Sequence, residues 1–403
     1  MANDSVIDQY LAHYAEPEAA FARGRVHKIY QNCLIIPCFD ETEDFLSQVL
    51  PRGIADLLVI VVVNAPVSAP QDAVDRTAKL LAGLAGNTSR TMGVIPYTAA
   101  QNVDVLVIDR VSTSRRLPPN QGVGLARKIG ADISLELYQH GSIAEPWLYS
   151  TDADATLPGD YFTTPLEEEA VNLFGFQHKS QDERLHAKGQ LYETYLRYYV
   201  NRLSYARSPY AYHTLASTMV IPVSGYAKVR GFPKRNAGED FYLLNKLAKV
   251  VDIHSLHTPR IELQARASTR VPYGTGPAIQ HMPEDPACYL SYAPECFDEL
   301  KAVLENIRSS EPDSPWRSLE VADKALQVLG FFEFFTRAQQ QFKSSSTLHK
   351  ALHQWLDGFR SLRFIHEIRH EYPDVPLLET LGLLLGTRSG DYLDQLRNLE
   401  RAS

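Results

Sequence analysis

The chain has 403 residues, of which 44% are hydrophobic and 22% charged, a composition typical of globular proteins and far from disordered or fibrous chains. Its formal net charge is −8 at pH 7, and without a strong basic patch such a chain is not expected to bind nucleic acid. The four cysteines form no C-x-x-C pair, which argues against a zinc site or a disulfide framework. The first thirty residues lack a signal-type apolar stretch and no later segment is long enough to span a membrane, so we expect a cytoplasmic protein.

Short apolar segments alternate with longer amphipathic ones from Gln31 to Ser150, which is typical of βαβ units around a parallel sheet. The predicted strands are 33–37, 57–64, 104–109 and 147–150. The predicted helices between them are 41–50, 69–85 and 122–140. The continuous apolar run from Leu58 to Val63 indicates a central strand that is buried on both faces.

Beyond Ser150 the pattern becomes mixed. It predicts strands at 171–176 and 219–223, a long helix at 184–207 and a further helix that begins at Glu239. From Ala293 onward the periodicity is helical, with prolines as breakers. We therefore predict three parts: an N-terminal helical extension over 1–30, an α/β domain over 31–285 and a C-terminal helical domain over 286–403.

Asp152 and Asp154 form a D-x-D motif directly after the predicted strand 147–150. Two carboxylates at the carboxyl end of a strand can face one divalent cation that also takes phosphate oxygens. Such a cation acts as a Lewis acid on a departing diphosphate. The same spacing also suits an Asx-type turn that closes the strand, so the motif alone leaves both interpretations open.

Glu239 and Asp240 follow Gly238 at the start of a predicted helix. A carboxylate at this point can accept the proton of an attacking hydroxyl group as a general base. Acidic residues in the first turn of a helix also stabilise its dipole without any catalytic role. Both interpretations remain open from this motif alone.

A glycine-containing segment, Gly122 to Gly130, begins the third predicted helix. Backbone N–H groups at a helix N-terminus can approach a phosphate, and Arg127 or Lys128 would add positive charge. The segment is not a dinucleotide-binding G-x-G-x-x-G motif, because Arg127 takes the position of the third glycine.

Taken in order, these motifs resemble the family 2 glycosyltransferases and their GT-A relatives over about residues 31 to 280. An apolar strand that ends in a proline and a small acidic turn comes first, as in Ile35 to Glu41. A G-x-x-x-A-R-x-x-G helix then precedes an apolar strand and D-x-D, as in Gly122 to Asp154. An E-D pair begins a later helix, and Asp240 lies 86 residues after Asp154. The resemblance implies a GT-A fold, with a mixed, mostly parallel sheet flanked by helices and followed by the C-terminal helical region.

The resemblance also implies roles for the acidic residues. Asp154 matches the aspartate that coordinates Mn²⁺ or Mg²⁺, and Asp152 matches its partner, which contacts the donor and the metal. Asp240 matches the general base of the inverting members, and Glu239 beside it would orient the acceptor.

Donor contacts follow from the same match. Pro37, Phe39 and Glu41 would line the nucleobase and ribose pocket, joined by Arg127. Members of the family usually carry an aspartate after the second strand, whereas this chain has Asn64 there. An amide can still pair with a base edge, so we retain Asn64 as a donor contact, and the preferred base is left open.

Two later segments extend the predicted site. The loop from Arg266 to Gly276 combines arginines with glycines, so it could close over the diphosphate with Arg270 and exclude water; an ordinary surface loop is the alternative. His257 is a candidate further metal ligand, with an ordinary histidine as the alternative. A Q-x-x-R-W element is absent, and Gln264 to Arg266 is its nearest counterpart, so processive polymer synthesis is not supported.

Together these features predict a metal-dependent, hexosyltransferase-like enzyme. It would move a sugar from a nucleotide-diphosphate sugar to a sugar, lipid or small-molecule acceptor, with inversion and Asp240 as base; retention becomes more credible if His257 is a ligand. One alternative is a nucleotidyltransferase, although the turn after the first strand is acidic at Asp40 and Glu41 where such enzymes carry a basic glycine-rich loop. A non-catalytic nucleotide-sugar-binding module is the other, and the presence of both acidic pairs argues against it.

Overall fold

The computed structural model describes residues 2–85, 92–96, 103–268, 274–386 and 391–402. The chain divides into two compact units. We call Met1–His186 with Thr214–Pro277 the sheet unit, and Ala187–His213 with Ala278–Ser403 the helical unit. Arg270, which we predicted to contact the donor, lies outside the described residues.

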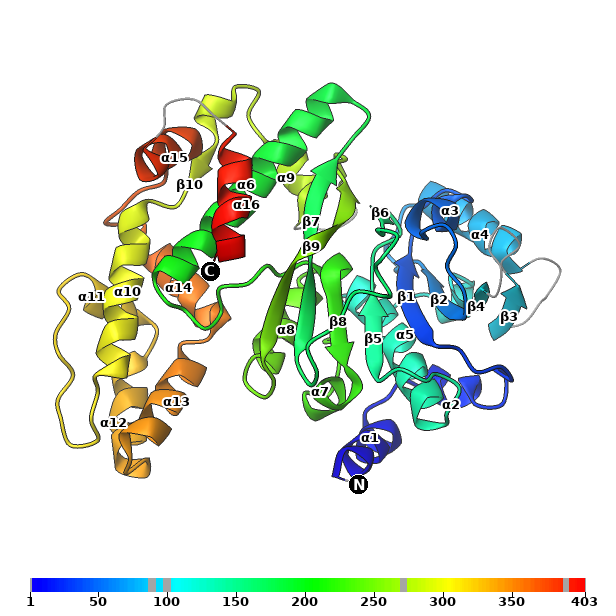
Figure 1. Ribbon diagram of the computed structural model, residues 1–403, viewed down its shortest axis with the longest axis horizontal. Helices are drawn as coiled ribbons and strands as arrows, with labels where there is room; N and C mark the ends of the chain where they lie inside the picture. The colour runs from blue at the N-terminus through cyan, green and yellow to red at the C-terminus, as the bar shows by residue number, and fades with distance from the viewer. Residues whose placement is uncertain (1, 86–91, 97–102, 269–273, 387–390, 403) are drawn as a thin grey trace. The chain divides into compact units, whose positions relative to one another are not determined.

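The sheet unit contains one large mixed sheet (Figure 1). In spatial order the strands are β3 (Met92–Pro96), β4 (Val103–Arg110), β2 (Leu57–Asn64), β1 (Asn32–Cys38), β5 (Trp147–Ser150), β8 (Met219–Pro222), β7 (Val171–Lys179), β9 (Ile253–Gln264) and β6 (Ala155–Thr156). Strands β4, β2, β1 and β5 are parallel to their neighbours in this group, whereas β3 and β8 pair antiparallel. Further along, β7 and β9 pair in parallel.

Continuous apolar sequence explains the centre of the sheet. Every residue of β2 is buried, because helices cover both faces of a parallel region and leave no face for polar side chains. Helix α4 (Gln71–Ala85) packs against β2 and β4, and α5 (Gly122–Gln139) packs against β1, β2 and β5. The predicted α/β class, with a mixed sheet flanked by helices, is confirmed.

Some elements differ from the expectation. The helix predicted at 41–50 is shorter, α3 (Phe45–Val49), because Asp40 has a positive φ of 57° and the chain turns before the helix begins. Strands β3 and β9 were not predicted. Strand β9 contains Pro259 and a register shift opposite β7 between Leu173 and Gly175, and a proline inside a strand obscures the strand pattern in the sequence.

The N-terminal helices belong to the sheet unit. Helix α1 (Ala2–His13) packs against α5 and α7 (Val223–Lys228), and α2 (Pro17–Ala22) packs against α5. The buried hydroxyl of Tyr10 donates to Asp132 Oδ1 at 2.6 Å, and Lys128 Nζ donates to Asp132 Oδ2 at 2.8 Å. Tyr226 also donates to Asp132 Oδ1, at 2.9 Å. Three helices therefore meet at one buried carboxylate.

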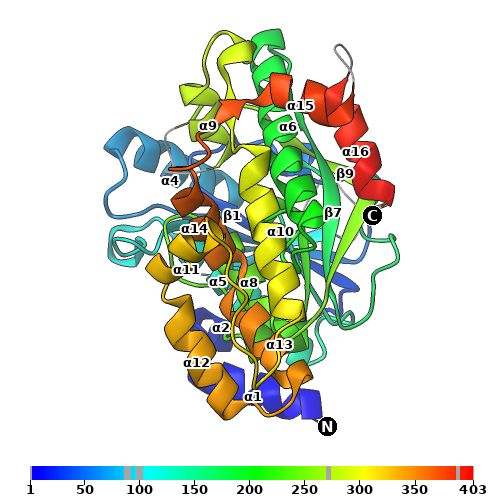
Figure 2. The same ribbon diagram turned by 90° about the vertical axis from the view of Figure 1, so that its left-hand side faces the viewer.

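The helical unit contains most of α6 and the helices of the C-terminal region. They are α6 (Glu183–Tyr205), α10 (Pro294–Arg308), α11 (Ala322–Val328), α12 (Phe331–Gln341), α13 (Ser345–Trp355), α14 (Gly358–Ile368), α15 (Leu377–Leu385) and α16 (Tyr392–Ala402). Strands β10 (Leu290–Ser291) and β11 (Val375–Pro376) add a short antiparallel ladder. Helices α6 and α10 lie side by side (Figure 2), and the ring centroids of Tyr198 and Phe297 are 6.0 Å apart. The C-terminal region is helical as predicted apart from β10 and β11, and the helical unit also contains Ala187–His213, which we had expected in the α/β domain.

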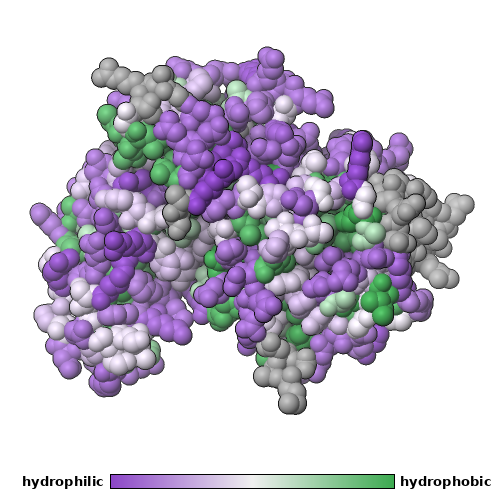
Figure 3. Space-filling model, in the orientation of Figure 1, coloured by the Kyte–Doolittle hydropathy of each residue, from purple (hydrophilic) through white to green (hydrophobic). Residues whose placement is uncertain are grey.

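Five short elements complete the part of the chain that the structure describes. They are helix α8 (Glu239–Leu247), helix α9 (Thr275–His281) and the 3₁₀ turns Thr113–Arg115, Ala216–Thr218 and Pro286–Cys288. Within the described ranges no helix combines the length and apolarity needed to cross a membrane. An apolar surface patch coincides with α15 in Figure 3, where Leu383 is 79% exposed.

Candidate active site

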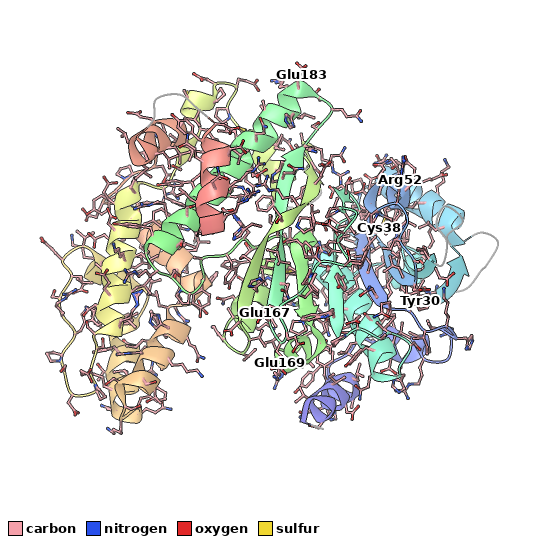
Figure 4. All side chains as sticks on the ribbon, viewed as in Figure 1. Tyr30, Cys38, Arg52, Glu167, Glu169 and Glu183 are labelled. Atoms are coloured by element: carbon pink, nitrogen blue, oxygen red, sulfur yellow. The ribbon has the colours of Figure 1, made fainter. Side chains whose placement is uncertain are left out.

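Two strand ends bring the predicted acidic residues to one edge of the sheet. Strands β1 and β5 are parallel neighbours, with Leu34 opposite Tyr149, so their carboxyl ends lie at the same edge, where open α/β sheets bind ligands. Figure 4 labels Tyr30 and Cys38, which flank the start and the end of β1. Glu41 follows β1 at this edge, and Asp152 follows β5.

A buried arginine joins the D-x-D motif to the E-D pair. Arg127 is only 2% exposed, and its Nε donates to Glu239 Oε1 at 2.8 Å. Its Nη2 forms an ion pair with Asp152 Oδ1, and its Nη1 donates to Ser150 Oγ at 2.9 Å. Two acidic motifs that are far apart in the sequence therefore share one guanidinium group. This places Arg127 between the two motifs.

The glycines of α5 explain how Arg127 reaches this position. A side chain at Gly124 would lie 2.4 Å from the carbonyl oxygen of Pro233, and the N–H of Gly124 donates to Arg235 O at 2.9 Å. A side chain at Gly130 would lie 2.4 Å from Ile35. The glycines thus allow α5 to approach both β1 and the segment before Glu239. Our suggestion that the α5 N-terminus approaches a phosphate is not supported, because backbone covers the glycines.

A second arginine links Glu41 to the D-x-D motif. Arg266 Nη2 lies 2.7 Å from Glu41 Oε1 and 2.7 Å from Asp154 Oδ2, and Nη1 donates to Glu41 Oε2 at 3.1 Å. Arg266 follows β9, which pairs antiparallel with β6 through Leu263 and Ala155. This pairing brings the end of β9 beside Asp154. The sequence pattern places Arg266 at the start of a loop and at the end of the Gln264–Arg266 segment, and neither position predicts these contacts.

The E-D pair is fixed by backbone groups. Gly238 has a φ of 71°, a conformation that glycine adopts without strain, and it begins α8. Asp240 Oδ1 accepts from the N–H of Phe241 at 2.7 Å, and Oδ2 accepts from the N–H of Ala216 at 3.1 Å. Asp240 is therefore oriented from two sides.

The turn Ala216–Thr218 supplies contacts that sequence reasoning missed. Next to Ala216, the hydroxyl of Ser217 donates to Asp152 Oδ2. One short turn thus contacts both acidic motifs. Its residues are small and match no motif, so no sequence signal distinguished them from an ordinary turn before a strand.

Burial and like charges raise the pKa of several carboxyl groups here. Burial raises the pKa of Asp154 to about 7, with Arg266 opposing and Asp152 and Glu41 adding to the rise. Burial and then the charge of Glu239 raise the pKa of Asp240 to about 7. The pKa of Glu41 rises to about 6, again chiefly through burial. The carboxylates that meet at this edge of the sheet are called the acidic cluster: Glu41, Asp152, Asp154, Glu239 and Asp240.

The acidic cluster has more negative than positive charge. Four of its carboxylates contact the two guanidinium groups of Arg127 and Arg266 in the described part of the chain, and Asp240 is held by backbone N–H groups. Burial is the main cause of the raised pKa values, and neighbouring carboxylates add to them, because both disfavour the charged form of a carboxyl group. A divalent cation fits this charge balance. A diphosphate, itself an anion, would be repelled without one.

The donor set suits a shared cation. In the described ranges no group of three or more His, Cys, Asp or Glu side chains is arranged to hold a metal. Mg²⁺ commonly takes only one or two protein carboxylates and completes its shell with water and substrate phosphates. Asp154 and Asp152 can provide such a pair at the strand end.

The remaining residues predicted to contact the donor or the metal are not linked to the acidic cluster by the contacts described above. Asn64 is buried, and its Nδ2 donates to the backbone carbonyls of Cys38 and Val62 at 3.2 and 3.0 Å. Pro37 is buried within β1, and Phe39 is partly buried just beyond it. His257 lies in the irregular part of β9, where the register opposite β7 shifts between Leu173 and Gly175, and its carbonyl oxygen packs against Gly175. Its role as a metal ligand stays a prediction.

Comparisons with known proteins give only distant similarity. No protein-family model and no curated protein matches the chain. One similar solved structure is S. aureus TarS 1–349 in complex with UDP-GlcNAc, at 12% identity and a TM-score of 0.33, covering 92% of this chain and 91% of that one. Another is the mannosyltransferase PcManGT from Pyrobaculum calidifontis in complex with GDP-Man and Mn²⁺, at 12% identity and a TM-score of 0.36, covering 100% and 89%. Neither similarity assigns an activity to this chain.

Proposed function

We propose that this chain is a metal-dependent glycosyltransferase that moves a sugar from a nucleotide-diphosphate sugar to a hydroxyl acceptor. The observation that carries the proposal is the contact of Arg127 with both Asp152 and Glu239. Such a transfer needs one carboxylate group near the departing diphosphate and another near the acceptor hydroxyl. Arg127 joins the D-x-D motif, proposed for the first role, to the E-D pair, proposed for the second. All of these residues belong to the sheet unit.

Asp240 is the proposed general base. Its carboxylate is held by two backbone N–H groups, and its pKa near 7 suits a group that must accept a proton at neutral pH. The acceptor hydroxyl would give its proton to Asp240 as its oxygen attacks the anomeric carbon. The bond from that carbon to the diphosphate breaks, which inverts the configuration. Glu239, held by Arg127, would orient the acceptor.

Asp154 and Asp152 would hold a Mn²⁺ or Mg²⁺ ion. When bound, such an ion neutralises the charge that develops on the departing diphosphate. Asp152 is positioned for this by Arg127 and Ser217. Glu41 stands at the neighbouring strand end, where we propose that it contacts the donor.

Two observations bear on the alternatives. A nucleotidyltransferase would need a basic loop directly after β1. That turn instead carries the acidic Asp40 and Glu41, and two arginines, Arg76 and Arg266, are engaged in ion pairs with these two residues. A binding module would have no use for a carboxylate with a pKa near 7 held by two backbone N–H groups, and Asp240 is such a group. We therefore retain sugar transfer as the proposal.

A ligand screen tests the proposal. We would measure the melting temperature of the full chain with nucleoside diphosphates and nucleotide sugars, each with and without Mn²⁺, starting with UDP-GlcNAc and GDP-mannose. A ligand that binds only the folded state raises this temperature by mass action. We expect at least one nucleotide sugar to stabilise the protein in a Mn²⁺-dependent way. If none does, and no donor is hydrolysed when Mn²⁺ or Mg²⁺ is added, the proposal is wrong.

The stereochemistry has its own test. Once a donor is found, the anomeric configuration of the product can be followed by NMR during the first turnovers. Inversion is expected for a single displacement with Asp240 as base. A product with retained configuration would contradict that role for Asp240, although sugar transfer itself would stand.

A further inference from the structure

Arg266 contacts one of the carboxylate oxygens that a divalent cation would need, Asp154 Oδ2. We infer that Arg266 is an internal cation that competes with the metal for Asp154, so that metal binding is an exchange of one cation for another. This inference rests on the proposed function, because it concerns the metal of that same site. It adds a residue that sets how tightly the metal binds.

The contact geometry supports direct competition. Arg266 Nη2 lies 2.7 Å from Asp154 Oδ2, a distance typical of a charge-assisted hydrogen bond. A divalent ion bound to Asp154 would lie at about 2.1 Å from a carboxylate oxygen. Two cations on the same small carboxylate repel each other strongly in a partly buried site. Asp154 can therefore hold Arg266 or the metal closely, but not both.

Glu41 provides a place for the displaced guanidinium. Both oxygens of Glu41 contact Arg266, at 2.7 and 3.1 Å, and Glu41 is only 11% exposed. This fork-to-fork arrangement is the strongest common geometry for an arginine–carboxylate pair. Arg266 can thus release Asp154 while it stays paired with Glu41. The exchange requires only a small movement of one side chain.

The two arginines of the site differ in the property that exchange requires. Arg127 is 2% exposed and joins two motifs, whereas Arg266 is 27% exposed. Removing a fully buried guanidinium would leave buried carboxylates without a partner. Arg266 lies at the solvent boundary, where its movement exposes little buried charge. We therefore assign the exchangeable role to Arg266 and a fixed role to Arg127.

Titration of Mn²⁺ alone tests the inference. The full chain, freed of metal with EDTA and then dialysed, would be titrated calorimetrically without nucleotide, at about pH 8 so that protons compete little with the metal. Loss of one charge-assisted contact corresponds to about a tenfold change in affinity. We expect R266Q to bind Mn²⁺ about tenfold more tightly than the unmodified chain. R266K should fall between the two, because lysine keeps the charge but cannot bridge Glu41 and Asp154 as a fork.

A matched control separates occupation of Asp154 from a general loss of positive charge. Arg76 pairs with Asp40, next to Glu41, so R76Q removes one guanidinium from the same strand end without touching Asp154. We expect the Mn²⁺ affinity of R76Q to stay within about twofold of the unmodified chain, since exposed ion pairs contribute little. Equal gains in R76Q and R266Q would contradict the competition.

Stability gives a second readout. R266Q should melt at a lower temperature than the unmodified chain without Mn²⁺, and should gain more from added Mn²⁺. Unchanged or weaker Mn²⁺ binding by R266Q overturns the inference, because a residue with a purely structural role would lower the affinity when removed. Should Mn²⁺ bind normally and nucleotide sugars still stabilise the protein, the proposed function stands without this inference. If neither metal nor nucleotide sugar binds any variant, both fail.

Discussion

The two units each contain a buried group of charged residues, and the two groups differ in the ratio of carboxylates to guanidinium groups. In the helical unit, Glu193 accepts from Arg197 and Arg397, each at 2.8 Å. Glu400 pairs with Arg197 and lies 2.9 Å from His213 Nε2. Two buried carboxylates there face two guanidinium groups, and the exposed Asp394 also pairs with Arg397. In the sheet unit, two guanidinium groups contact four carboxylates of the acidic cluster, and the fifth, Asp240, is held by backbone N–H groups.

The difference agrees with a structural role for the first group and with the proposed catalytic role for the second. A balanced network neutralises itself and joins α6 to α16. In the sheet unit, burial and neighbouring carboxylates raise the pKa of Asp154, Asp240 and Glu41. The excess of carboxylates among the described residues fits the proposed cation site. Four predictions test this contrast, from the largest expected effect to the smallest.

D240N should have the largest effect on activity. An asparagine keeps the shape of Asp240 but cannot accept a proton, and loss of a general base typically lowers turnover by about 10²- to 10⁴-fold. Donor binding, measured by thermal shift with Mn²⁺, should stay close to that of the unmodified chain. Unchanged turnover would remove Asp240 from the role of base.

The two buried arginines offer a direct comparison of stability. R127M leaves Glu239 and Asp152 without their shared cation, and an uncompensated buried charge costs about 3–5 kcal/mol. R197M should cost less, about 1–3 kcal/mol, because Arg397 still pairs with Glu193 and His213 still faces Glu400. Urea unfolding followed by circular dichroism measures both. Equal losses would show that charge balance does not distinguish the two groups.

The raised pKa of Asp240 predicts a pH-dependent stability. Folding raises this pKa from 3.8 to about 7, so the folded state holds its proton more tightly than the unfolded state. The resulting stabilisation is complete below about pH 4 and is lost as the pH rises through 7. Relative to D240N, the unmodified chain should lose roughly 4 kcal/mol at most over this window. A constant difference between the two proteins would contradict the shift.

S217A should have the smallest effect. It removes the hydrogen bond from Ser217 to Asp152 Oδ2, while Arg127 still holds Oδ1. A single hydrogen bond to a charged group contributes about 1.5–3 kcal/mol, so the donor affinity should fall about tenfold in a thermal-shift titration. S224A is a control, since Ser224 lies in α7 away from these contacts. If the turnover of S217A fell as far as the turnover of D240N, Ser217 would act in the chemical step and not only in positioning Asp152.

Sequence patterns predicted the parts of the fold that depend on local order. The buried runs of β1 and β2 and the long helix α5 were found because continuous apolar or periodic segments report burial directly. Strand β9 was missed because Pro259 and several polar residues interrupt that signal. Its recognition depends on pairing with β7, which is distant in the sequence.

The candidate site shows the same limit. Asp152, Asp154, Glu239 and Asp240 were found as motifs, but their connection through Arg127 could not be read from spacing. Arg266 meets Glu41 across 225 positions in the chain, and no local pattern encodes such a contact. From the sequence, the glycines at the start of α5 suggested a phosphate site. In the structure they make room for the segment near Pro233, which lies more than a hundred residues away and could not be foreseen from local sequence. Long-range packing decided each of these points.

The buried contact of Tyr10 with Asp132 has a practical consequence for work on this protein. Helix α5 carries both Asp132 and Arg127, so helix α1 contacts the same helix that places Arg127 in the candidate site. Trimming the chain past Tyr10 would remove a partner from a buried carboxylate and a buried lysine. Recombinant forms intended for assays should therefore keep the residues before Tyr10, and a tag is better placed with a spacer than fused directly to that helix.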